Sequence, residues 1–97
     1  MKIHGDINEY NLNFDSSLLP LFNAMKDGKE IKSITCMSGS MNKNDPSKDF
    51  KIKKFRPTNY FHMMGYSDDS GWSDYVTTDV EPRGFYMNWI RSFELNK

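Results

Sequence analysis

The sequence predicts a small α+β domain in which one helix packs on a mostly antiparallel sheet of about five to six strands, in the order β-α-β-β-β-β-β. Three observations support this fold class. One short segment has helical periodicity, several β-prone runs alternate with turn residues, and no repeat or linker interrupts the 97 residues. We therefore treat residues 1–97 as a single domain.

The helix is expected at residues 17–27. Asp15 offers an N-cap oxygen, Pro20 falls in the first turn, and Gly28 can end the helix in a left-handed conformation. Between these signals, four apolar residues recur at helical spacing: Leu18, Leu21, Phe22 and Met25. This stripe predicts the face that packs on the sheet.

The strands are expected where β-branched and aromatic residues lie between turn signals. These segments cover residues 2–14 (one or two strands, with a bulge or tight turn near Asn8), 30–37, 50–55, 59–66 and 72–78. Residues 38–48 contain almost nothing apolar, so they are expected to form an exposed loop.

The C-terminal segment, residues 85–95, has two interpretations. As a strand, it would form a hairpin with residues 72–80 through a turn at 81–84 that contains Pro and Gly. As a helix, it would carry an apolar stripe that begins with Tyr86 and Trp89. We favour the strand because the segment is rich in aromatic residues, and the helix stays open as the alternative.

Composition bears on compartment and origin. A single cysteine excludes an intramolecular disulfide, the first residues contain no apolar signal segment, and no apolar run could span a membrane, so we expect a cytoplasmic protein. Phe, Tyr, Met, Ile, Asn and Lys total 44 residues, against 14 for Gly, Ala, Arg and Pro. Because A/T-rich codons encode most of the first set, we favour a phage or mobile-element protein that works in the host cytoplasm.

The zero net charge conceals two regions of opposite sign. Residues 43–56 carry six cations and two carboxylates, whereas residues 57–82 carry five carboxylates and no Lys or Arg. In the segment 48–61, aromatic residues are interleaved with cations, as in sequence-tolerant binders of single-stranded nucleic acid. The candidate nucleic-acid-binding residues are Lys51, Lys53, Lys54, Phe55, Arg56 and Tyr60. The alternative is that the cations lie on solvated strand faces and the aromatic residues belong to the core.

An acidic turn at residues 67–75 places carboxylates around two aromatic residues, the layout of an interface hot spot with a charged rim. The candidate partner-binding residues are Asp68, Asp69, Trp72, Asp74 and Tyr75. The same composition suits an ordinary turn, and it lacks the spacing and the closing Glu of a calcium-binding EF-hand loop.

Residues suited to catalysis are few. His4 and His62 have no metal-ligand spacing to each other or to Cys36, and a lone Cys on a strand is more often a small core residue than a nucleophile. No glycine-rich phosphate loop is present. We therefore predict no catalytic residue, no metal and no cofactor, in a protein that is not an enzyme.

These observations predict a small non-enzymatic inhibitor or modulator that binds a protein with a charged surface. As a phage or mobile-element protein it would act on a host protein, in host takeover or anti-defence. A nucleic-acid-binding protein that uses segment 48–61 is the first alternative. A small structural or assembly protein, whose sheet edge pairs with a copy of itself, is the second. The sequence leaves the partner and the oligomeric state open.

Overall fold

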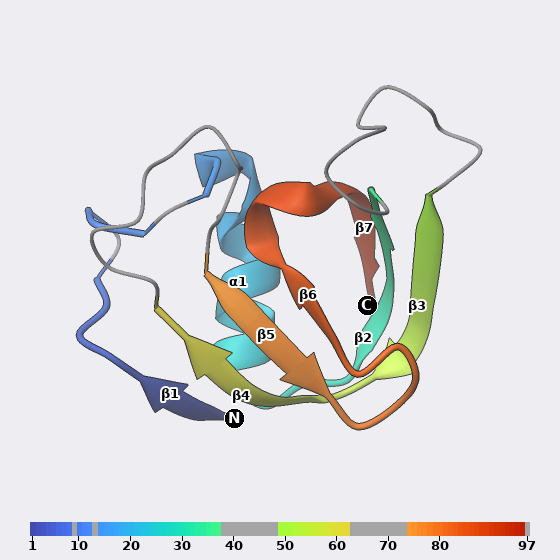
Figure 1. Ribbon diagram of the computed structural model, residues 1–97, viewed down its shortest axis with the longest axis horizontal. Coiled ribbons are helices and arrows are strands. Elements are labelled where there is room, and N and C mark those ends of the chain that lie inside the picture. The colour runs from blue at the N-terminus through green and yellow to red at the C-terminus, as the bar shows by residue number, and fades with distance from the viewer. Residues whose placement is uncertain (9, 13, 38–48, 63–73, 97) are drawn as a thin grey trace.

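The computed structural model describes residues 1–8, 10–12, 14–37, 49–62 and 74–96 (Figure 1). The helix α1 covers Leu19–Lys26 and continues a 3-10 turn at Ser16–Leu18, and a second 3-10 turn lies at Met87–Trp89. The strands are β1 (Lys2–His4), β2 (Ile31–Cys36), β3 (Phe50–Phe55), β4 (Pro57–Phe61), β5 (Tyr75–Thr78), β6 (Gly84–Tyr86) and β7 (Ile90–Leu95).

The strands form two sheets. The four-stranded sheet has the order β1-β4-β5-β6, and the three-stranded sheet has the order β3-β2-β7. Every neighbouring pair is antiparallel except β1 and β4, which run parallel. The α+β class and the mostly antiparallel pairing are therefore confirmed. The single sheet of five to six strands is wrong, because the described residues form seven strands that are divided between two sheets.

The predicted helix is confirmed, together with the residues that begin and end it. The Asp15 side chain accepts a hydrogen bond from the Ser17 backbone N–H at 2.9 Å, and Pro20 lies in the first turn of α1. Gly28 follows the helix with φ 76°, a conformation that glycine adopts without strain. The whole apolar stripe is buried: Leu18, Leu21, Phe22 and Met25.

The N-terminal segment contains less strand than expected. Of residues 2–14, only Lys2–His4 form a strand within the described part of the chain. Beyond it, the Asn8 side chain accepts a hydrogen bond from the Tyr10 N–H, and Asn11 accepts one from the Asn8 N–H. Asparagine side chains compete for backbone groups in this way, so the chain forms the tight turn expected near Asn8 instead of a second strand.

The C-terminal segment is neither a helix nor one continuous strand. β6 belongs to the four-stranded sheet, and β7 belongs to the three-stranded sheet. The 3-10 turn at Met87–Trp89 carries the chain from one to the other, with the Met87 side chain fully buried. The spacing of Tyr86 and Trp89 therefore reflects one helical turn and not a longer helix, and the centroids of their rings lie 5.0 Å apart. The predicted hairpin is confirmed, since β5 pairs with β6.

The core lies between α1 and the inner faces of the two sheets (Figure 1). The rings of Phe22 in α1 and Tyr60 in β4 meet edge to face at 5.1 Å. Phe55 in β3 meets Phe85 in β6 in the same manner at 5.7 Å, which joins the two sheets. Among the described residues, four buried aromatic side chains thus share the core with six aliphatic ones, two methionines and Cys36.

Candidate functional site

The outer face of the three-stranded sheet is polar and basic. Ile34 and Ile52 are register partners on β2 and β3 and point into the core. Because side chains alternate along a strand, the neighbouring partners Ser33–Lys53 and Thr35–Lys51 point to the opposite face. The lysines Lys51 and Lys53 are exposed there.

A local backbone distortion adds a third cation to this face. Lys54 has φ 51°, in the left-handed region that L-residues rarely adopt. Regular alternation would turn Lys54 inward and Phe55 outward. Instead Lys54 is exposed next to Lys53, and Phe55 is fully buried. The distortion therefore allows two consecutive lysines to face solvent while the core keeps its aromatic ring.

These lysines surround a shallow depression of about 250 Å³. We call it the lysine surface, and its described residues are Lys32, Ser33, Lys51, Lys53, Lys54 and Glu94. Four cations face one carboxylate, and that carboxylate lies 3.4 Å from Lys32 in an exposed ion pair. Exposed pairs of this kind contribute little stability, so the surface retains a positive field.

The other three candidates for nucleic-acid binding lie elsewhere. Arg56 donates a hydrogen bond from Nη1 to the Gly28 carbonyl at 2.8 Å, which holds its guanidinium at the end of α1. Phe55 and Tyr60 are fully buried in the core. Their side chains cannot stack on bases, so the alternative that assigned them to the core is the correct one.

The predicted partner-binding turn is only partly described. Asp68, Asp69 and Trp72 lie outside the described residues. Asp74 was predicted at the surface, yet its side chain is fully buried at the start of β5. Tyr75, the next residue, is half-buried on the outer face of the four-stranded sheet.

Asp74 is buried because two side chains from β4 and its C-terminal end supply hydrogen bonds. The Tyr60 hydroxyl donates to Asp74 Oδ2 at 2.7 Å, and His62 Nδ1 lies 2.9 Å from Asp74 Oδ1. Burial and the neighbouring Asp74 carboxylate raise the pKa of Tyr60 well above its usual range. We call these three residues the buried triad, and it fixes β4 against β5.

The four-stranded sheet carries a row of rings that the sequence analysis missed. His4, Phe61, Tyr75 and Tyr86 are register partners on consecutive strands, and all are half-buried on the face opposite α1. His4 stacks on Phe61 at 4.5 Å, and Tyr75 lies 4.7 Å from Tyr86. Trp89 extends the row beside Tyr86. Each ring alternates along its strand with a residue that belongs to the core or packs against it, so the sequence pattern could have placed each ring on the outer face. The pattern could not show that the four rings lie side by side, because that depends on the register between the strands.

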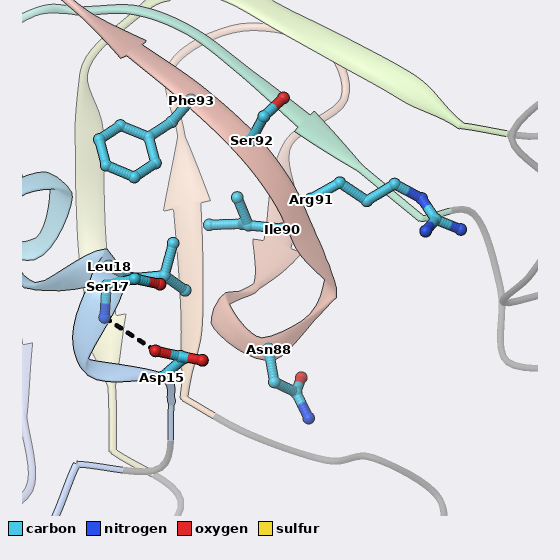
Figure 2. A pocket seen from close by; sticks show the side chains of 8 residues that line it. All are labelled: Asp15, Ser17, Leu18, Asn88, Ile90, Arg91, Ser92 and Phe93. Atoms are coloured by element: carbon cyan, nitrogen blue, oxygen red, sulfur yellow. Dashed lines mark hydrogen bonds between the residues drawn. The ribbon is translucent and has the colours of Figure 1, made fainter.

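A larger pocket of about 540 Å³ lies between the 3-10 turn before α1 and β7 (Figure 2). Leu18, Ile90 and Phe93 supply apolar side chains to its lining, and Asp15 supplies a carboxylate. The hydrogen bond from the Ser17 N–H lowers the pKa of the Asp15 carboxyl, which is fully exposed. Asp15 therefore caps the 3-10 turn that leads into α1. Among the described residues that line the pocket, the other charged side chain is Arg91, which extends away from the pocket and pairs with Asp49 at 2.8 Å.

The candidate nucleophile is unsuited to that role. Cys36 is fully buried on β2, and desolvation, followed by the charge of Asp49, raises the pKa of its thiol to about 12. Near neutral pH the thiol therefore stays protonated. Within the described residues, no three His, Cys, Asp or Glu side chains come together to hold a metal ion.

Comparisons with known proteins give no relative for this chain. No family model matches it, and neither the curated proteins nor the solved structures contain a match. No helix among the described residues is long and apolar enough to cross a membrane.

Proposed function

We propose that this chain is a non-enzymatic protein that binds an acidic partner protein through the lysine surface. The observation that carries the proposal is the grouping of four lysines around one depression on a sheet face, with Glu94 as the one carboxylate lining it among the described residues. A field of one sign steers an oppositely charged partner and raises the association rate. Lys51, Lys53 and Lys54, predicted for nucleic acid, thus serve an acidic polypeptide here.

A protein partner is favoured over nucleic acid by what surrounds the lysines. Proteins that bind single-stranded nucleic acid combine cations with aromatic side chains on which the bases stack, and here Phe55 and Tyr60 are in the core. The composition, typical of an A/T-rich genome, favours a phage or mobile-element origin. In that setting the partner is a host protein, and binding inhibits or modulates it.

The test compares two charge reversals of equal size. Lys51→Glu with Lys53→Glu alters the lysine surface, and Lys2→Glu with Lys29→Glu alters exposed lysines elsewhere. Fluorescence anisotropy with labelled poly-L-glutamate at low salt should show affinity weakened by about tenfold in the first variant and little changed in the second. Added salt should weaken wild-type binding.

Three outcomes would overturn the proposal. If poly-L-glutamate does not bind, or if both variants lose affinity equally, the lysine surface is not a binding site. If oligo-dT binds and poly-L-glutamate does not, nucleic acid is the ligand. Circular dichroism of both variants establishes that each is folded before the comparison is made.

A further inference from the structure

The lysine surface borders a strand that forms one edge of its sheet in the described part of the chain. β3 is the outermost strand of the three-stranded sheet, and among the described residues it pairs only with β2. Figure 1 shows β3 at the margin of the molecule, with no other labelled strand beyond it. Such an edge presents backbone N–H and C=O groups that can pair with one more strand.

We propose that the partner supplies an extended acidic segment that adds to β3 as a fourth strand of this sheet. This inference rests on the proposed function and specifies how the lysine surface is used. An added strand would place every second side chain beside Lys51 and Lys53 on the outer face. Acidic residues at those positions would make opposite-charge pairs across the two strands.

The inner face of β3 sets the other half of the pattern. Phe50 is half-buried and Ile52 is buried, and both belong to the apolar core or pack against it. The side chains of an added strand that lie beside them are best matched if they are apolar. The segment recognised is therefore one in which acidic and apolar residues alternate. Main-chain hydrogen bonds supply the affinity in this mode of recognition, and alternate side chains supply the specificity.

Charge also argues against a second copy of this chain as the occupant. Antiparallel pairing of two β3 strands would bring the Lys51–Lys54 segments of the two copies together. Like charges directly opposite each other on a sheet are destabilising. Lysines on edge strands commonly prevent pairing altogether, and here the same lysines would exclude a copy while admitting an acidic strand.

The test uses a labelled peptide of alternating Glu and Val with two backbone-modified forms. One form is N-methylated at each Glu, and the other at each Val. A strand added to an edge directs only every second N–H toward its neighbour, so one methylated form should bind about tenfold or more weakly, and the other should bind like the parent. The protein variant Lys51→Glu with Lys53→Glu should bind the parent peptide more weakly than the wild type does. The variant Lys2→Glu with Lys29→Glu should bind it with unchanged affinity.

The outcomes separate this inference from the proposed function. If both methylated peptides bind like the parent, binding is electrostatic without strand addition, and only the present inference is overturned. The same holds if poly-L-glutamate binds and no alternating peptide does. If nothing acidic binds, both proposals fail. If analytical ultracentrifugation shows that the protein self-associates and that the peptide disrupts this association, a second copy of the chain occupies the β3 edge. In that case the acidic segment is not the natural occupant of the edge.

Discussion

Removing the hydroxyl group of Tyr60 should destabilise the protein far more than removing an exposed hydroxyl group. In Tyr60→Phe the ring is retained, but Asp74 Oδ2 loses the donor that lies 2.7 Å away. Leaving a buried acceptor without its hydrogen bond costs about 1–3 kcal/mol, so we expect a loss near 2 kcal/mol. The total stability of a domain of this size is only about 5–15 kcal/mol.

Thermal unfolding followed by circular dichroism measures this effect. A loss of about 2 kcal/mol should lower the Tm by roughly 8–16 °C in a chain of this length. Tyr10→Phe is the matched control, because Tyr10 is 92% exposed and its hydroxyl is available to water. If Tyr60→Phe and Tyr10→Phe melt at the same temperature, the hydrogen bond to Asp74 contributes nothing, and the account of the buried triad is wrong.

Two further predictions concern the sheets. A Cβ at position 84 would overlap the hydroxyl end of the Tyr75 side chain, so Gly84→Ala should lower the free energy of unfolding measured by urea denaturation. The same substitution should lower it clearly less in a Tyr75→Ala background. The Cys36 thiol should resist alkylation at pH 8 until urea unfolds the chain, since its pKa is near 12 and its ordinary value is 9.0. As the pH rises, the thiol ionises in the unfolded chain before it ionises in the folded protein. The contribution of the buried thiol to the free energy of unfolding should therefore be complete below about pH 9 and should decline as the pH rises toward 12. A Cys36→Ala variant should lack this part of the pH dependence.

Local features of the fold were predictable from the sequence, because neighbouring residues determine them. The Asp15 cap, Pro20 and Gly28 delimit the helix through contacts within a few residues, and β3 begins and ends at the predicted positions. The division into two sheets was not predictable in this way. It depends on the turn at Met87–Trp89, which joins two strands that have no partner in common.

The candidate site shows the same limit. The predicted basic segment does contain three lysines of the lysine surface, but Lys32 comes from β2 and lies about twenty residues earlier in the chain. Asp74 occurs in a run of polar residues typical of an exposed turn, and its donors come from residues 60 and 62. Local composition predicts exposure well only where no distant donor is brought within reach.

The order of the strands has a consequence for how the chain folds during synthesis. β2 is the central strand of its sheet, yet one of its two neighbours is β7, which ends at Leu95. Likewise β1 gains its partner only when β4 has been made, 57 residues later at the Lys2–Asn59 pair. Contacts so distant in sequence slow folding, because chain entropy is lost before they form. On the ribosome, the four-stranded sheet can be completed only after β6 has emerged, and the three-stranded sheet only after β7 has emerged. The nascent chain must therefore keep its aromatic core residues soluble until late in synthesis.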